Sequence, residues 1–210
     1  MAQRSKTMSN SNLIKKMTGT AILIAIIVVF QFIGNNINIS GVSFNLSLLP
    51  VTIGAFIYGP LVGGFLGLVT GIMVLPGAGA FMAYNVFFTL LVCLTKTTIA
   101  GFVSGLLFNL LKKKNLVVAA FVASMVVPII NSGIFAIGCF TIFKGMLLPY
   151  ASSPDTYVGY VFLVLIGVNF LFELIVAITL TPSTLFVLKT VLKSSPSINN
   201  LYNKKEDGIH

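Results

Sequence analysis

Long apolar runs separated by short polar stretches dominate the chain. Six such runs occur, at residues 17–33, 44–58, 61–75, 81–111, 117–143 and 157–188. A helix that crosses a bilayer needs about 20 predominantly apolar residues. The second and third runs are shorter than this and meet at Gly59-Pro60, which predicts short, tilted or partly re-entrant helices. The pattern therefore predicts an all-α fold, a polytopic membrane bundle of six transmembrane helices.

The composition argues against a water-facing surface. Hydrophobic residues make up 57% of the 210 residues, charged residues make up 8%, and the mean hydropathy is +1.03. A soluble domain carries roughly 25% charged residues. A soluble enzyme, a nucleic-acid-binding protein and a disordered tail are therefore poor interpretations, despite the net charge of +9. We expect the chain to associate with the lipid bilayer and not with nucleic acid.

The basic residues fall in three clusters that apolar runs separate. Of the 13 Lys and Arg residues, four lie within the first 16 residues, three at 112–114 and four after residue 188, which leaves Lys96 and Lys144. With six crossings, all three clusters share one side of the membrane, and the positive-inside rule assigns that side to the cytoplasm. We therefore expect both termini to be cytoplasmic. The predicted organisation is an N-tail at 1–16, a six-helix transmembrane domain at 17–188 and a C-tail at 189–210.

The chemistry-bearing residues form no catalytic or metal-binding motif. Cys93 and Cys139 stand alone in apolar runs, without the paired spacing of a metal site or of a disulfide framework. The single histidine, His210, has no partners for a catalytic constellation. The sequence also contains no Walker A motif for ATP. We therefore expect no enzymatic activity, no cofactor and no bound metal.

Two charged side chains fall inside predicted membrane helices, where each requires a partner or a purpose. Lys96 lies 16 residues before Lys112, and Glu173 lies 16 residues before Lys189. At about 1.5 Å per residue, both lie roughly 24 Å from the cytoplasmic ends of their helices. One interpretation is an ion pair that only joins two helices. The other is that Lys96 presents its charge to an anionic ligand while Glu173 tunes or holds the lysine.

Amide side chains form a second polar pattern. Three lie in different helices of the second half, and others lie at the outer end of the first run. Amides both donate and accept hydrogen bonds without a net charge, which suits a small polar ligand. The alternative is ordinary hydrogen bonding between helices, typically worth about 0.6 kcal/mol per contact. The candidate ligand-binding residues are Lys96, Asn85, Asn131, Asn169, Tyr84, Gln31 and Asn36.

Several local sequences resemble one transporter family. Ala21 and Ala25 place two small residues on one face of the first helix, where another helix can approach closely. The sequence Asn45-Leu46-Ser47-Leu48-Leu49-Pro50 leads into Tyr58-Gly59-Pro60-Leu61-Val62-Gly63-Gly64. With the size and the six helices, these features resemble the substrate-binding S components of energy-coupling factor (ECF) transporters over residues 17–188. Ala83-Tyr84-Asn85 and Leu91-Val92-Cys93-Leu94-Thr95-Lys96 are similar to the branch that includes pantothenate S components.

The resemblance implies a membrane-embedded vitamin-binding subunit of an ATP-driven uptake transporter in the bacterial plasma membrane. It implies a substrate cavity near the extracellular side and docking of Ala21 and Ala25 against a transmembrane coupling subunit, which two cytoplasmic ATPase subunits drive. Pantothenate is the expected vitamin, because its carboxylate can pair with Lys96 and its hydroxyls and amide with asparagines. Cobalamin, riboflavin, folate and a pyridoxine-like compound remain open. An autonomous secondary carrier and a structural membrane subunit without a small ligand are the competing interpretations.

Overall fold

The computed structural model describes residues 2–36, 38–39, 42–43, 45–151 and 156–194, and these are almost entirely helical. The all-α prediction is therefore confirmed, with a two-residue antiparallel strand pair as the one departure among the described residues. The elements are α1 Ala2–Asn36, β1 Asn38–Ile39, β2 Val42–Ser43, α2 Leu48–Tyr58, α3 Pro60–Val74, η1 Leu75–Ala78, α4 Gly79–Tyr84, α5 Val86–Leu111, α6 Leu116–Thr141, α7 Lys144–Leu147, η2 Leu148–Tyr150, α8 Tyr157–Gly159, η4 Tyr160–Gly167 (a π-helical segment) and α9 Val168–Ser194.

Five helical spans in the described part of the chain are long and apolar enough to cross a membrane. They are Leu13–Asn36, Pro60–Tyr84, Val86–Leu111, Leu116–Thr141 and Tyr157–Val191. The remaining apolar helix, α2, has 11 residues and is therefore about 16 Å long, roughly half of a hydrocarbon core. The chain is thus a multi-pass membrane protein, while a sixth full crossing stays a prediction.

The boundary predicted at residue 81 is wrong. The third span continues through η1 and α4 to Tyr84, and the next helix begins at Val86. Pro76 lies in the first turn of the short helix η1, where a missing backbone N–H costs little, so the chain remains helical there. The break comes at Asn85, whose Oδ1 accepts a hydrogen bond from the Phe88 backbone N–H at 3.1 Å and caps α5.

A tight turn at Gly59 joins α2 to α3. Gly59 has a φ of 92°, which residues with a side chain rarely adopt, and Pro60 supplies the first residue of α3. The chain therefore reverses direction within one residue. The predicted meeting of two helices at Gly59-Pro60 is confirmed.

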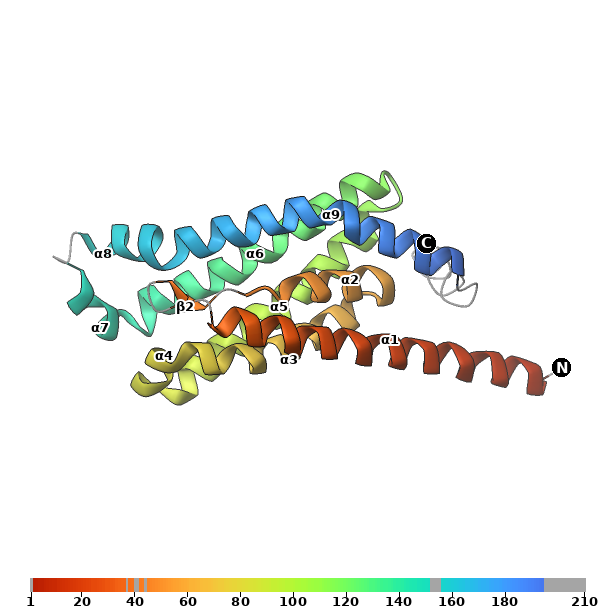
Figure 1. The fold of residues 1–210 in the computed structure, drawn as a ribbon, viewed down its shortest axis with the longest axis horizontal. Coiled ribbons are helices and arrows are strands. Elements are labelled where there is room, and N and C mark those ends of the chain that lie inside the picture. Colours follow the sequence, from red (N-terminus) through yellow and green to blue (C-terminus); the bar gives the residue numbers. More distant parts are fainter. Residues whose placement is uncertain (1, 37, 40–41, 44, 152–155, 195–210) are drawn as a thin grey trace.

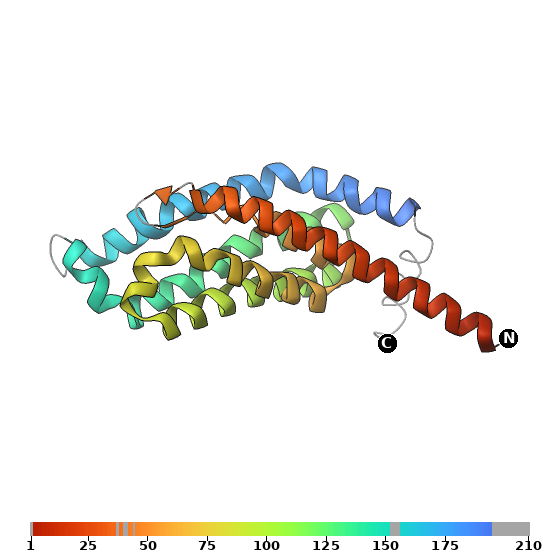
Figure 2. The ribbon, with the colours of Figure 1, turned by 60° about the horizontal axis from the view of Figure 1, so that its bottom comes forward.

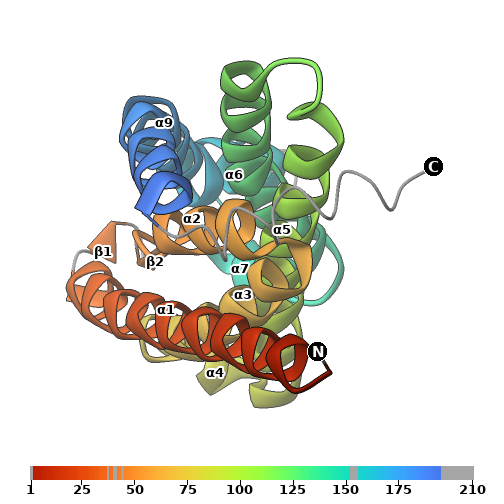
Figure 3. The same cartoon turned by 90° about the vertical axis from the view of Figure 1, so that its right-hand side faces the viewer.

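The helices pack as a bundle around the short helix α2, which contacts α1, α3, α5, α6 and α9. The end-on view shows α1 and α3 on one side of α2, with α6 and α9 on the other (Figure 3). The beginning of α1 and the end of α9 lie at the same end of the bundle, and the β1–β2 pair, α4 and α7 lie at the opposite end (Figure 1). The first turns of α1 project beyond the other helices (Figure 2).

Glycines allow α3 and α5 to approach closely. A Cβ atom added at Gly67 would collide with the backbone carbonyl of Thr97, and one at Gly71 would lie 2.8 Å from the carbonyl oxygen of Cys93. The backbones therefore touch where side chains would otherwise separate them. This contact fixes α5, and with it Lys96, against the third span.

We expect Gly67→Ala to destabilise the protein, because the added methyl group meets backbone that cannot move aside. Over-packing of this kind costs about 1–3 kcal/mol, which for a chain of this length corresponds to a fall in Tm of roughly 2–12 °C. Thermal unfolding of the detergent-solubilised protein measures the change. Gly133→Ala on α6 is the matched control, because a Cβ there meets nothing within 4 Å. Equal melting temperatures for the two variants would contradict the close contact.

Candidate functional site

Lys96 of α5 is buried in the bundle, with 7% of its surface exposed. Its Nζ lies 5.0 Å from the ring centroid of Phe135 on α6. The lysine lines a cavity with a free volume of about 30 Å³, together with Asn45, Thr89, Phe143 and Asn169. Phe81 of α4 also lines this cavity, and its ring packs edge-on against those of Phe135 and Phe143. A single buried cation therefore faces a small chamber of aromatic and amide groups.

Glu173 of α9 is also buried, with 5% of its surface exposed. Asn131 of α6 donates through Nδ2 to both carboxylate oxygens, at 3.2 and 3.1 Å, and Asn169 donates to Oε1 at 3.4 Å. Among the described residues, no ion pair joins Glu173 to Lys96. Of the two interpretations of these charges, the simple ion pair between helices is not the one that this structure forms.

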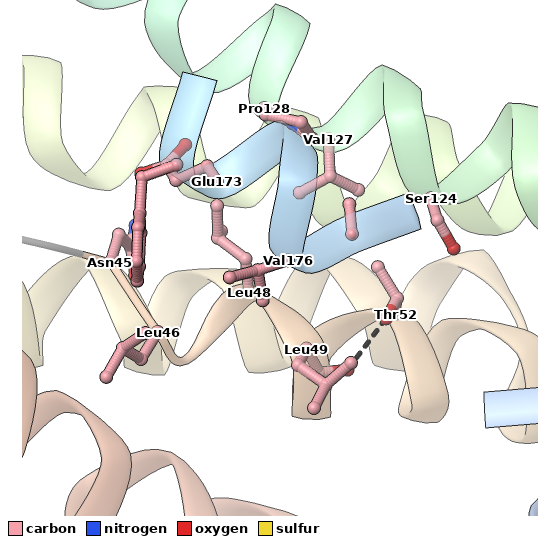
Figure 4. Close-up of a pocket in the computed structure, with 12 residues that line it drawn as sticks. Asn45, Leu46, Leu48, Leu49, Thr52, Ser124, Val127, Pro128, Glu173 and Val176 are labelled. Atoms are coloured by element: carbon pink, nitrogen blue, oxygen red, sulfur yellow. Dashed lines mark hydrogen bonds between the residues drawn. The ribbon is translucent and has the colours of Figure 1, made fainter. Parts of the chain in front are cut away.

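A second cavity, with a free volume of about 20 Å³, lies beside Glu173 between α2, α6 and α9. Its wall is largely apolar, and its polar groups are Asn45, Thr52, Ser124 and Glu173. Figure 4 shows Asn45 and Glu173 at one end of this cavity, with Thr52 and Ser124 at the other. Asn45 lines both cavities and therefore lies between them.

Hydrogen bonds hold the segment that carries Asn45 against α1. The hydroxyl of Ser47 lies 2.8 Å from Gln31 Oε1 and 2.8 Å from Asn45 Oδ1, and its single proton can go to either oxygen. Gln31 donates through Nε2 to Asn35 at 2.8 Å, and Asn35 donates to the carbonyl of Met73 at 2.9 Å. These hydrogen bonds tie the C-terminal end of α1 to the beginning of α2 and to α3.

Three amide atoms at the site are buried without a hydrogen-bond partner in the described structure: Asn45 Nδ2, Asn131 Oδ1 and Asn169 Oδ1. A buried polar atom left without a partner costs about 1–3 kcal/mol. Buried polar atoms without a hydrogen-bond partner are rare in folded proteins. A group of them beside two buried charged side chains is typical of a binding site for a polar ligand.

The structure brings together some of the predicted ligand-binding residues and not others. Lys96, Asn131 and Asn169 lie at the two cavities or bond to their charged groups. Gln31 is buried and reaches the site through Ser47 and Asn45. The other three predicted residues, Asn85, Tyr84 and Asn36, line neither cavity. Asn85 caps α5, and Tyr84 is 50% exposed. Asn36 is exposed and donates a hydrogen bond to the carbonyl of Phe32.

Asn45 lines both cavities, and the sequence pattern alone did not single it out as a site residue. Asn45 is 5% exposed and precedes α2, where a polar residue reads as part of an ordinary loop. A signal existed in the Asn45–Ser47 pair, because two polar residues at alternate positions introduce an otherwise apolar run.

The cavities are too small for a vitamin-sized ligand in this conformation. Their free volumes, about 30 and 20 Å³, hold one or two water molecules each, whereas ligand pockets usually measure about 300–1,000 Å³. A ligand must therefore displace the side chains between α5, α6 and α9 when it binds.

Ala21 and Ala25 lie on the exposed face of α1. The opposite face carries Leu23, Ile27 and Gln31, which are buried against the bundle. The small residues are thus available to a partner helix outside the chain, and they are absent from its own core.

Comparison with known proteins places this architecture in a family. The family described as "ECF transporter, substrate-specific component" matches residues 15–185, from the beginning of the first span into the last. No curated protein and no solved structure matches the chain. Because the family match extends over most of the chain, and the multi-pass helical fold agrees with it, the chain belongs to the ECF transporter substrate-specific component family.

Proposed function

We propose that the chain is the pantothenate-binding S component of an ECF uptake transporter. It binds the vitamin at the Lys96 cavity, on the extracellular side, and delivers it inward with a transmembrane coupling subunit and two cytoplasmic ATPases. The observation that supports pantothenate is the buried Lys96 ammonium, whose contact in the described structure is the Phe135 ring and not a carboxylate.

A buried ammonium favours an anionic ligand. Removing such an ion from water costs several kcal/mol, and a contact with an aromatic ring returns about 2 kcal/mol or a little more when it is desolvated. A ligand carboxylate at Lys96 would supply the missing counter-charge. Pantothenate offers that carboxylate together with an amide and two hydroxyls, which match the amide groups around the cavity.

The orientation in the membrane follows from the positive charges. The beginning of α1 and the end of α9 lie at the same end of the bundle (Figure 1), and the basic residues at 112–114 follow α5. If this end faces the cytoplasm of a bacterium, as the positive-inside rule requires, then both termini are cytoplasmic and α2 makes a short sixth crossing. The tails are then residues 1–16 and 189–210, on either side of a substrate-binding domain at 17–188.

The coupling partner is expected at the exposed alanines of α1. Ala21 and Ala25 present methyl groups on one outward face, where a helix of the coupling subunit can pack at short distance. The energy for transport then comes from the two ATPases, since the chain itself carries no Walker A motif.

We expect Lys96→Ala to weaken pantothenate binding more than tenfold, which is a loss above about 1.4 kcal/mol. The variant removes the positive charge that would face the carboxylate. Isothermal titration of the purified chain in detergent measures the affinity. Lys144→Ala is the matched control, because that lysine is exposed at the start of α7. Unchanged affinity in Lys96→Ala would remove the lysine from the ligand site.

We also expect Ala21→Trp and Ala25→Trp to retain vitamin binding and to abolish assembly with the coupling subunit. An indole on this face prevents close approach of a second helix, while the cavity lies elsewhere in the bundle. Co-purification with the coupling subunit measures assembly, and titration measures binding. Ile22→Trp serves as the control, because Ile22 is exposed but rotated by about 100° from Ala21 on the helix. Vitamin uptake that survives in the alanine variants would count against this docking face.

A further inference from the structure

The two cavities carry opposite charges. Lys96 lines one, and Glu173 lines the other. Both side chains are buried, at 7% and 5% exposure, and no ion pair joins them in the part of the chain that the structure describes. A buried charge without a counter-charge is costly. The separation of these two charges into neighbouring chambers therefore requires an explanation beyond helix packing.

Amide groups connect the chambers. Asn45 lines both of them, and its Nδ2 is buried without a partner among the described residues. Asn169 lines the lysine chamber and donates to Glu173, one helical turn further along α9. Its Oδ1 is also buried and unpartnered. An unused donor and an unused acceptor thus lie near the boundary between the positive chamber and the negative one.

Glu173 retains capacity to accept further hydrogen bonds. A carboxylate offers about four lone-pair positions. Two amide nitrogens approach it here, one of them shared between both oxygens. Because Glu173 also lines the second cavity, a donor placed in that cavity can reach the remaining acceptor positions.

We infer that the two cavities are halves of one ligand site, and that Glu173 determines specificity for the end of the ligand that donates hydrogen bonds. The ligand class is a carboxylate joined through a central amide to a hydroxyl-bearing end. Lys96 binds the carboxylate, Asn45 and Asn169 bind the amide, and Glu173 accepts from the hydroxyls. This inference rests on the proposed function and assigns the second half of its site.

Each simpler ligand class leaves one charge unsatisfied. A plain anion such as an acyl chain with a carboxylate satisfies Lys96 and gives Glu173 no donor. A cation satisfies Glu173 and is repelled by Lys96. A neutral ligand leaves the lysine unpaired. Because sites built around buried polar groups strongly reject analogues that leave those groups unpaired, the arrangement selects for both ends together.

The test pairs three ligands with two variants. The ligands are pantothenate, its alcohol analogue (the carboxylate replaced by a hydroxymethyl group) and an N-acyl-β-alanine of the same carbon skeleton without the hydroxyls. Isothermal titration of the full-length chain in detergent measures each affinity. We expect the wild-type protein to bind pantothenate at least tenfold more tightly than either analogue. This comparison needs no substitution and is independent of any folding defect.

The variants separate the two ends. Lys96→Met should abolish the preference for pantothenate over the alcohol and retain the preference for the hydroxylated ligand. Glu173→Gln, which has nearly the same shape as glutamate, should do the reverse. Thermal unfolding confirms that each variant is folded. Where Glu173→Gln fails to fold, Asn45→Ser replaces it and should weaken pantothenate binding at least tenfold through loss of the amide contact.

The outcomes distinguish the inference from the proposed function. Tight pantothenate binding with equal wild-type affinity for the ligand without hydroxyls overturns the inference and leaves the pantothenate function in place. Retention of the hydroxyl preference in Glu173→Gln has the same meaning. Failure of the wild-type protein to bind pantothenate at all overturns both.

Discussion

Two buried charges in an apolar bundle are the constraint on which the rest of the structure depends. Lys96 and Glu173 lie on different helices, and no ion pair joins them in the part of the chain that the structure describes. Asn131 and Asn169 hold the carboxylate, and the ring of Phe135 faces the ammonium. In a hydrocarbon environment such charges persist only where surrounding groups compensate for lost hydration. The bundle keeps them in place, and in the proposed function a ligand supplies the rest of that compensation.

The scaffold around these charges is rigid on one side and adaptable on the other. Between α3 and α5, glycines bring backbones into contact, so that the helix of Lys96 has little freedom against the third span. On the opposite side, α9 follows a π-helical segment, Tyr160–Gly167, and carries both Asn169 and Glu173. π-helical segments are frequent at functional sites. Because the cavities must enlarge before a vitamin can enter them, we expect α9 to be the helix that moves.

Much of the fold was predictable because a bilayer imposes simple rules on sequence. Apolar runs marked the spans, and Gly59-Pro60 marked the reversal between α2 and α3. The break at Asn85 was not predicted, because Pro76 suggested an earlier stop and an asparagine within an apolar run gives no sign that it caps a helix. Local sequence does not reveal whether a helix interrupts at a proline or continues through it.

The site was predictable in part, and for a different reason. Charges and amides within spans are conspicuous, so that Lys96, Asn131 and Asn169 could be identified from sequence. Which amide faces a cavity depends on how each helix is rotated by its neighbours, so Asn45 was missed and Asn85 was included. The hydrogen bond from Asn131 to Glu173 could not be predicted from the sequence either, because the two residues meet only through the packing of α6 against α9.

The central claim is that this chain binds a vitamin by itself, before any coupling subunit or ATPase takes part. Isothermal titration of the purified chain in detergent against pantothenate, with riboflavin and cobalamin as comparators, tests it most directly. We expect saturable one-to-one binding of pantothenate, without metal or ATP, and no binding of the two comparators. A well-folded sample that binds none of the three vitamins would contradict it.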